Sequence, residues 1–392
     1  MPVGYNPHTT ATRTHCECQV MSSVPSDRPH VALIGPVTPF RGGIAQHTAL
    51  LLKELSARGD VEAFSFSRQY PCWFFPGESD RDPTLVGQVE PGVRYMIDSM
   101  NPLTWRRTLR AIIGSGARSV IIPWWTVFWA PCFGYLARAF HRAGIEVVFL
   151  CHNVVEHEPT VWKIALTRMV LRSADRFVVH THSDASLLED LLPGAKVAVC
   201  PHPVYESFPS PSCTLPRRSA TELLFFGFIR PYKGLPVLLD AMHLLGDLDV
   251  ALSIVGEPWC DITPLVTSVR DKGLADRIEF VTRYVSAGEA ADFFARADLV
   301  VLPYLSATGS GVVPLAYHYR KPVIVTTVGG LPDVVEDGVS GYLIPPDDPA
   351  AAASAVRRFV SEQPRDMTPG IALVSSTMTW SRLAAVVLSG SD

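Results

Sequence analysis

The sequence predicts an α/β protein of two doubly wound domains, each organised around a parallel sheet. Short apolar runs of strand length alternate with segments of helical periodicity along most of the chain. At 392 residues and 47% hydrophobic content, the chain is long enough to bury two cores. The alternation also begins afresh at Glu222, after a stretch rich in Pro and Ser (Pro201–Ser219) that is typical of an interdomain linker.

Composition narrows the class of protein. The net charge of −4 leaves no overall basic footprint, so nucleic acid is not an expected partner. Residues 1–29 are polar and lack the apolar core of a signal peptide, which predicts a disordered leader, with Met21 as an alternative start, and a cytoplasmic location. The eight cysteines show no paired CxxC spacing for zinc and are expected to be reduced thiols.

The first domain begins as a doubly wound fold should. A buried strand at His30–Gly35 leads through Gly42 and Gly43 into a helix at Ile44–Arg58. The two glycines allow a ligand to approach the backbone at a helix N-terminus, although tight packing of the turn would also explain them. Further strands are predicted at Val61–Phe66, Ser119–Ile122, Ile145–Leu150, Arg176–His180 and Lys196–Cys200.

Two segments of this domain lack a simple assignment. Ser67–Pro102 shows no clean periodicity and is predicted to be a functional or acceptor-facing loop region, although its Pro, Trp and Phe would also suit plain loop packing. The aromatic run Trp124–Trp129 is followed by Pro131 and Arg138, which makes a transmembrane helix an unsuitable assignment. Its rings indicate an aromatic-lined acceptor cleft or a face at a membrane interface, with ordinary core burial of about half of them in either case.

Histidines and carboxylates follow the fourth predicted strand. His152 comes directly after it, and Glu156, His157 and Glu158 lie a few residues on. Ligands bind beyond the carboxyl ends of parallel strands, so His152 and the carboxylates are candidates for chemistry. For His157 and for His180, at the end of the next strand, a satisfied polar group is the simpler interpretation.

The second domain opens with a strand at Leu223–Gly227 and a basic loop. Arg230 and Lys233 stand three apart before a helix at Leu235–Leu245. Two cations placed there indicate either a solvated loop or an anion site that would suit a diphosphate. The remaining elements are predicted at Asp249–Val255, Ile278–Val281, Ala287–Ala297, Asp298–Leu302, Pro322–Thr327, Ala350–Val360 and Thr379–Leu388.

A small-residue turn at Ser306–Gly311 precedes a helix with Pro314 in its first turn. Free backbone N–H groups at the positive end of a helix dipole form a site for phosphate. A glycine-rich turn that only packs tightly would show the same residues. The turn alone therefore does not distinguish a phosphate site from tight packing, and the basic loop with Arg230 and Lys233 favours the phosphate site.

Four stretches together resemble family 4 of the retaining GT-B glycosyltransferases. They are IGPVTPFRGGIAQH (34–47), FGFIRPYKGL (226–235), VVLPY…GSGVVPLAY (300–317) and RKPVIVTTVGGLPDVVEDGVSGYLIPPDD (320–348). The resemblance extends from Val31 to Leu388. It implies two Rossmann-like domains that face a cleft: an acceptor-side domain at 30–205, a nucleotide-sugar-binding domain at 206–375, and a terminal helix within 376–392 that crosses back onto the first domain.

The resemblance also implies roles for individual residues. Arg230 and Lys233 match the pair that holds the donor diphosphate, and His152 matches a histidine that faces the donor sugar. The other donor-binding positions that it implies are Gly42 and Gly43 beside the diphosphate, Tyr284 and Val285 beside the nucleobase, and Gly309, Ser310, Gly311 and Val312 at the distal phosphate.

One departure limits the analogy. The family commonly carries two glutamates, eight residues apart, around this turn. Those positions fall at Ala307 and Leu315, and neither is a carboxylate. The chain is therefore expected to be a divergent subgroup, with an inactive or regulatory relative as the alternative.

We expect a hexosyl-type glycosyltransferase that moves a sugar from a nucleotide-sugar to a hydroxyl of a glycan, lipid-linked saccharide or natural product. Arg230, Lys233 and the turn amides would stabilise the leaving diphosphate, and no DxD stands beside them, so no metal or cofactor is expected. Retention is expected; inversion would need a base, with Glu156, Glu158 or His152 as candidates. The alternatives are a phosphorylase, a nucleotide-sugar epimerase or a non-catalytic nucleotide-binding subunit. The apolar Trp124–Trp129 run suggests a lipid-linked acceptor and peripheral contact with the inner face of the membrane.

Overall fold

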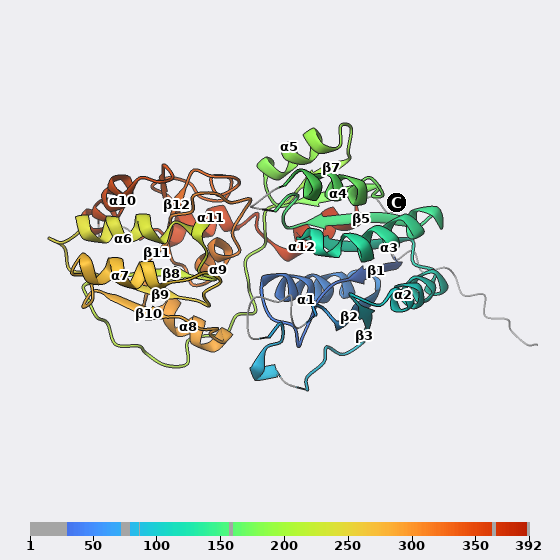
Figure 1. The fold of residues 1–392 in the computed structure, drawn as a ribbon, viewed down its shortest axis with the longest axis horizontal. Helices are drawn as coiled ribbons and strands as arrows, with labels where there is room; N and C mark the ends of the chain where they lie inside the picture. The colour runs from blue at the N-terminus through green and yellow to red at the C-terminus, as the bar shows by residue number, and fades with distance from the viewer. Residues whose placement is uncertain (1–29, 72–78, 86, 157–159, 363–365, 390–392) are drawn as a thin grey trace, which may run out of the picture.

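The protein folds into two parallel-sheet domains that lie side by side (Figure 1). The structure, a computed structural model, describes residues 30–71, 79–85, 87–156, 160–362 and 366–389. The predicted leader 1–29 and two of the candidate residues, His157 and Glu158, lie outside the described residues.

The first domain contains a seven-stranded parallel sheet in the order β3-β2-β1-β4-β5-β6-β7. This order reverses direction between β1 and β4, the point at which doubly wound sheets bind ligands. The strands are β1 (His30–Ile34), β2 (Asp60–Arg68), β3 (Val93–Asp98), β4 (Ser119–Trp124), β5 (Glu146–Cys151), β6 (Arg176–Val179) and β7 (Val197–Val199). The helices are α1 (Gly43–Ser56), α2 (Pro102–Ser115), α3 (Ala130–Arg142), α4 (Val161–Leu171) and α5 (His182–Leu191).

The second domain repeats the plan with six parallel strands in the order β10-β9-β8-β11-β12-β13. The two sheets confirm the predicted fold class. The strands are β8 (Thr221–Phe226), β9 (Val250–Val255), β10 (Ile278–Val281), β11 (Leu299–Leu302), β12 (Val323–Thr326) and β13 (Gly341–Ile344). The helices are α6 (Leu235–Leu244), α7 (Thr263–Asp271), α8 (Ala287–Arg296), α9 (Val312–His318), α10 (Pro349–Ser361) and α11 (Thr368–Ser375).

The central strands form because their sequences are short apolar runs that can be buried on both faces. Every residue of β4, β9, β11 and β12 is buried. The edge strand β3 was not predicted: most of its residues are partly exposed, Arg94 is exposed and Ile97 is buried, and its sequence contains no continuous apolar run. It lies inside the stretch Ser67–Pro102 that was expected to be loop.

The aromatic run belongs largely to the core. Trp124 and Trp129 are each 1% exposed, and Trp129 stacks on Phe133 with ring centroids 5.1 Å apart. The burial of these two rings agrees with the expectation that about half of the rings in this run belong to the core, since Trp125 and Phe128 are partly exposed. Phe133 belongs to α3, and Trp124 packs instead against Phe149 of β5 with ring centroids 6.1 Å apart.

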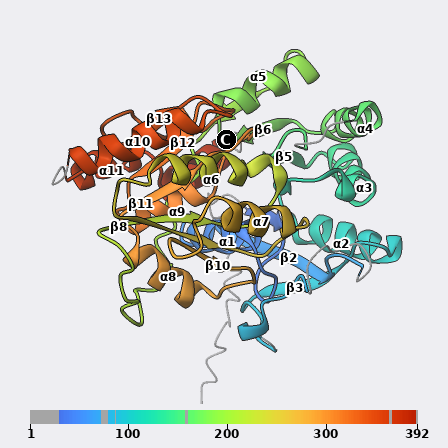
Figure 2. The same cartoon turned by 60° about the vertical axis from the view of Figure 1, so that its left-hand side comes forward.

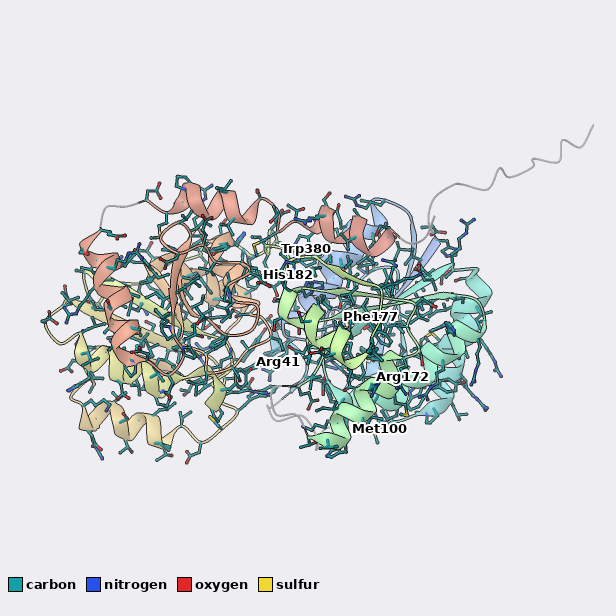
Figure 3. All side chains as sticks on the ribbon, turned by 90° about the horizontal axis from the view of Figure 1, so that it is seen from above. Arg41, Met100, Arg172, Phe177, His182 and Trp380 are labelled. Atoms are coloured by element: carbon teal, nitrogen blue, oxygen red, sulfur yellow. The ribbon has the colours of Figure 1, made fainter. Side chains whose placement is uncertain are left out.

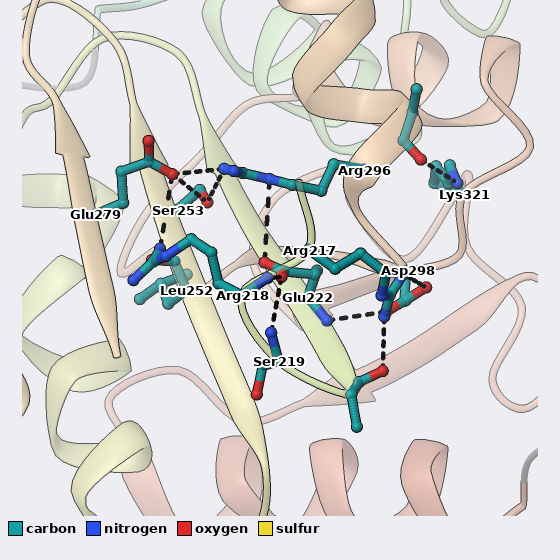
Figure 4. Close-up of polar contacts among 12 residues, drawn as sticks. Arg217, Arg218, Ser219, Glu222, Leu252, Ser253, Glu279, Arg296, Asp298 and Lys321 are labelled. Carbon is teal, nitrogen blue, oxygen red and sulfur yellow. Dashed lines mark hydrogen bonds and ion pairs between the residues drawn. The ribbon is translucent and has the colours of Figure 1, made fainter. Parts of the chain in front are cut away.

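A polar network holds the amino-terminal end of the second sheet, away from the carboxyl ends where ligands bind (Figure 4). Arg296 donates to Ser253 at 2.7 Å, contacts Glu279 at 2.5 Å and lies 4.0 Å from the buried Glu222. The Glu222 backbone N–H donates to Asp298 at 2.8 Å. The network joins β8, β9, β10 and the residue before β11, which fixes the scaffold beneath the site.

The last helix, α12 (Trp380–Leu388), packs on α1 of the first domain (Figure 1). Arg176 donates to the carbonyls of Val386 and Val387 at 3.1 and 2.7 Å, which caps the end of α12. The stretch Thr368–Leu388, α11 and α12 together, is long and apolar enough to cross a membrane by length and composition alone. The inward side chains of α12 are part of the core of the protein.

Candidate functional site

A cavity of about 360 Å³ lies between the two domains, next to the switch point of each sheet. Both domains supply its walls, since Gly43 begins α1 of the first domain and Val312 begins α9 of the second, and Figure 2 shows both helices. The structure brings most of the predicted donor-binding residues to this one cavity: Gly42, Gly43, Lys233, Tyr284, Val285, Gly309, Ser310, Gly311 and Val312.

Lys233 is a buried cation in the wall of this cavity. It is 8% exposed, and its ammonium lies 5.0 Å from the ring centroid of Tyr304 and 5.9 Å from that of Phe225. No carboxylate among the described residues forms an ion pair with it. Burial, together with the charge of nearby Arg230, lowers the pKa of Lys233 to about 8. A buried ammonium without a counter-ion is costly, so this wall of the cavity favours an anion.

The space in front of the Lys233 ammonium is unfilled because residue 227, which also lines the cavity, is a glycine. Gly227 follows β8 with a φ of +106°, which side chains rarely adopt, and a Cβ there would lie 3.1 Å from the Lys233 Nζ. A larger residue at 227 would occupy the space in front of the ammonium.

The small-residue turn lies next to Lys233 in the wall of the same cavity, since a Cβ on Gly227 would lie 3.1 Å from the Lys233 Nζ and 3.7 Å from a methyl group of Val312. The Ser310 hydroxyl accepts from the Val312 N–H at 3.2 Å and lies 3.4 Å from the Tyr304 hydroxyl. A Cβ on Gly311 would lie 3.2 Å from the hydroxyl of Tyr205, a residue of the linker. The glycine therefore lets the turn approach the linker closely while the turn still lines the cavity.

Two of the predicted catalytic residues, Arg230 and Glu156, do not line this cavity. The Arg230 guanidinium lies 4.3 Å from the ring centroid of Trp259. Glu156 pairs with Lys163 at 2.8 Å and accepts from Thr126 at 2.6 Å. Partial burial would raise the pKa of Glu156, but the contacts with Lys163 and Thr126 lower it overall. Neither residue is among those that line the cavity.

A second cavity of about 180 Å³ adjoins the first and contains His152. The two cavities share Gly43, Asn153, Tyr205 and the turn at 309–311. The wall of the second cavity also includes His180, His202, Thr181 and Asp184. Burial raises the pKa of the Asp184 carboxyl to about 6.

Four histidines gather beside this second cavity. Ring centroids lie 4.5 Å apart for His47 and His152, 5.2 Å for His47 and His180, and 5.0 Å for His47 and His202. Burial lowers the pKa of His180 to about 4 and that of His202 to about 3, and it holds those of His47 and His152 well below the usual value. All four are therefore neutral at pH 7.

Sequence reasoning singled out only His152 from this cluster as a functional candidate. The usable signal was positional: His152 follows β5 directly, His180 follows β6 directly, and His202 stands three residues after β7. Adjacent parallel strands end at one edge, so these side chains converge. His47 comes from α1, four residues after Gly43, and only the tertiary fold brings it to the cluster.

Direct contacts join the two domains around the cavities (Figure 3). Arg41 and Glu257 form a buried ion pair, and the Tyr284 hydroxyl donates to Asp82 at 2.7 Å. The His182 N–H donates to Asp333 at 2.8 Å. These links connect loops of the first domain with loops of the second.

The positions without the family's glutamates are apolar in the structure. Leu315 is 4% exposed and lines the first cavity. Among the described residues that line this cavity, Glu257 is the one carboxylate, and it comes from the end of β9.

Comparison with known proteins identifies related sequences for both domains. A family described as Glycosyltransferase Family 4 matches residues 41–208, and a family described as glycosyl transferases group 1 matches residues 220–362. A D-inositol 3-phosphate glycosyltransferase of Mycolicibacterium vanbaalenii is 29% identical over 57% of this chain and 54% of its own length. A GDP-mannose:glycolipid 4-beta-D-mannosyltransferase of Xanthomonas campestris pv. campestris is 29% identical over 64% of this chain and 70% of its own length. The chain thus spans about half the length of the inositol-phosphate relative.

Solved structures share the whole architecture. Sucrose-phosphate synthase from Thermosynechococcus elongatus superposes with a TM-score of 0.71 at 19% identity, covering 92% of this chain and 98% of that one. Anabaena Alr3699/HepE in complex with UDP gives 0.69 at 17% identity, covering 92% of this chain and all of the other. These likenesses show the two-domain fold.

Proposed function

We propose that the chain is a family-4-like glycosyltransferase of the GT-B class and that it transfers a hexosyl group from a nucleoside-diphosphate sugar to a hydroxyl acceptor. The observation that carries this proposal is Lys233, a buried ammonium without a carboxylate partner among the described residues, in the wall of the interdomain cavity. A donor diphosphate would supply the missing negative charge.

The proposed chemistry depends on charge at the leaving group. As the bond to the sugar breaks, negative charge grows on the diphosphate, and preorganised positive groups lower the barrier. Lys233 and the turn at 309–312 face the same cavity and would receive this charge without a metal ion at the diphosphate. Arg230, which has no carboxylate partner in the described part of the chain, would add positive potential from its place over Trp259.

We place the donor sugar toward the second cavity, where His152 lies. The proposal keeps retention of configuration, with the leaving phosphate accepting the proton of the acceptor hydroxyl. Of the candidate bases for inversion, Glu156 pairs with Lys163 outside both cavities, which supports retention, whereas His152 lines the second cavity and stays a candidate base. The mannosyltransferase relative is named for a 4-β-linked product, so we treat the product anomer as the deciding measurement. A β-linked product from an α-linked donor, seen by NMR, would overturn retention.

A thermal-shift screen with UDP-, GDP-, dTDP- and ADP-sugars tests the donor site. Solved relatives bind UDP and UDP-glucose, and a sequence relative is named for GDP-mannose, so these donors are tried first. We expect one nucleotide to raise the melting temperature of the native chain and to lose this effect in Lys233→Ala. Absence of any shift with all four nucleotides, together with no transfer, would overturn the proposal.

We further propose that the acceptor is lipid-linked and that the first domain rests on the inner face of a membrane. Helices α2, α3 and α4 lie along one side of the first domain (Figure 2) and contain no Asp or Glu. Their exposed cations include Arg106, Arg107 and Arg110 on α2. A surface with several cations and no carboxylate in its helices suits anionic lipid headgroups.

Apolar side chains stand among these cations. Leu103 on α2 is 63% exposed, and Val161 and Trp162 on α4 are 86% and 60% exposed. An exposed Trp beside cations is typical of a membrane interface. The mannosyltransferase relative acts on a glycolipid by its name, which supports the same acceptor class. The proposed contact thus uses α2 and α4 and not the buried Trp124 and Trp129.

A further inference from the structure

Three histidines present free nitrogen atoms to one another inside the first domain. His47, His152 and His180 each offer a ring nitrogen, and these three atoms all lie within 4.8 Å of one another. His47 is fully buried and His180 is 7% exposed. Both ring nitrogens of His47, and the Nε2 atoms of His152 and His180, are buried without a hydrogen-bond partner.

Unpartnered buried nitrogens are a cost that the fold would otherwise avoid. Each buried polar group left unsatisfied destabilises a protein by roughly 1–3 kcal/mol. Here several such atoms converge at one point, so a single bound species could satisfy them together. A cation would accept the lone pairs of several ring nitrogens at one point, and a water molecule that donates hydrogen bonds to them is the alternative.

The surroundings of His180 favour a metal ion. Its Nδ1 lies 2.9 Å from the Cys200 carbonyl oxygen, so Nδ1 carries the hydrogen and donates it. The lone pair on Nε2 then points away from that carbonyl as a ligand atom. Metal-binding histidines commonly donate their other ring N–H to a backbone carbonyl in this way.

We propose that His47, His152 and His180 bind one divalent transition-metal ion of the zinc class. Imidazole nitrogen suits zinc, copper, nickel and iron, and zinc is often held by three histidines with one coordination position open. Ligand nitrogens of a tetrahedral zinc ion lie roughly 3.3 Å apart, given Zn–N distances of about 2.0–2.1 Å. Small rotations of the three rings close the remaining separation.

The ion would connect separate parts of the first domain. His47 belongs to α1, and His152 and His180 follow β5 and β6. Trp380 of α12 packs against His47 with ring centroids 4.8 Å apart, so the same site contacts the terminal helix. His152 and His180 line the second cavity, and the open coordination position would face it. This site is distinct from the diphosphate position at Lys233 and does not depend on the proposed transfer reaction.

The test uses the full chain without a histidine tag. We expect about one zinc ion per chain by mass spectrometry after dialysis against zinc and then buffer. Cobalt added to the chelator-treated chain should give the visible absorption of a tetrahedral site. His47→Gln and, separately, His180→Gln should each weaken zinc affinity by roughly 100-fold or more, beyond the effect of losing an outer-shell partner.

The control variant is His243→Ala, which removes an exposed histidine of α6 and should leave the affinity unchanged. Circular dichroism of each variant checks that loss of zinc is not loss of fold. If one His→Gln variant unfolds, the other still decides the question. A chain that retains less than about a tenth of an equivalent of zinc, or whose zinc affinity in both variants equals that of the native chain, binds water and not a metal at this cluster. That result would overturn the proposal and leave the donor-site screen unaffected.

Discussion

Arg41 and Glu257 meet across the two domains, with the Arg41 Nη2 atom 3.1 Å and 2.9 Å from the two carboxylate oxygens. Their side chains are 6% and 11% exposed, and they stand 216 residues apart in the sequence. Arg41 lies in the loop after β1, and Glu257 follows β9 and lines the donor cavity. The pair therefore links the switch-point loop of one sheet to the wall of the proposed donor site.

We predict that Glu257→Gln loosens the contact between the domains. Removing one partner of a buried ion pair costs roughly 3–5 kcal/mol. Part of this cost can be avoided if the domains separate, which should appear as a larger radius of gyration in small-angle scattering. A double-mutant cycle with Arg41→Gln isolates the pair. Arg68→Gln, which breaks an exposed pair with Asp98, is the control. It should change neither the stability nor the radius of gyration by much.

Lys233→Ala should lower kcat/KM for the donor by roughly 100- to 1000-fold, as loss of a preorganised group at the leaving charge does. Arg230→Ala should cost less, because its guanidinium stacks on Trp259 outside the cavity. Lys272→Ala removes a cation of the same domain that pairs with Asp240 on the surface, and it should leave turnover near normal. Normal turnover in Lys233→Ala would overturn the proposal that the donor diphosphate binds at Lys233.

Lys233 also predicts how kcat/KM for the donor depends on pH. Burial places the pKa of Lys233 at about 8, so the ammonium that binds the diphosphate is present below pH 8 and is lost as the pH rises above it. We expect kcat/KM for the donor to fall about tenfold per pH unit above that value. Lys233→Arg keeps its charge at all these pH values, so its profile should lose this inflection even if its activity is lower. A pH profile that is flat to pH 10 in the native chain would contradict the assignment.

Local sequence patterns predicted the scaffold well where each element stood alone. The strands at the centre of both sheets are uninterrupted apolar runs, and the turn glycines and Lys233 have recognisable spacing. The edge strand β3 escaped prediction because half-exposed edge positions do not form such runs. The glycine-rich motifs located the cavity because each stands at the carboxyl end of a switch-point strand.

Relationships between distant segments were not predictable from local sequence. The residues around Arg41 do not predict its ion pair with Glu257, and those around His47 do not predict its contact with His180. Each contact forms only when two elements that are distant in the sequence pack together. The spacing of Arg230 and Lys233 indicated two equivalent cations. The structure instead places Lys233 in the cavity and Arg230 over an indole, a difference set by Trp259 in another loop.

The proposed membrane surface gives the last prediction. Arg106, Arg107 and Arg110 lie on one exposed helix, and each cation near an anionic surface contributes about 1 kcal/mol to binding. Changing all three to Ala should therefore weaken binding to vesicles that contain phosphatidylglycerol by roughly two orders of magnitude, and added salt should weaken the native chain similarly.

The matched control removes the same charge from the second domain, by changing Arg270, Arg357 and Arg358 to Ala. These arginines pair with carboxylates on the far domain, so the control should bind vesicles like the native chain. Trp162→Ser tests the apolar part of the surface and should weaken binding in a way that salt does not mimic, since its 60% exposed ring would enter the interface. Flotation of the native chain, both triple variants and Trp162→Ser with anionic and with neutral vesicles separates these effects. Equal flotation of the two triple variants would show that α2 does not face the membrane.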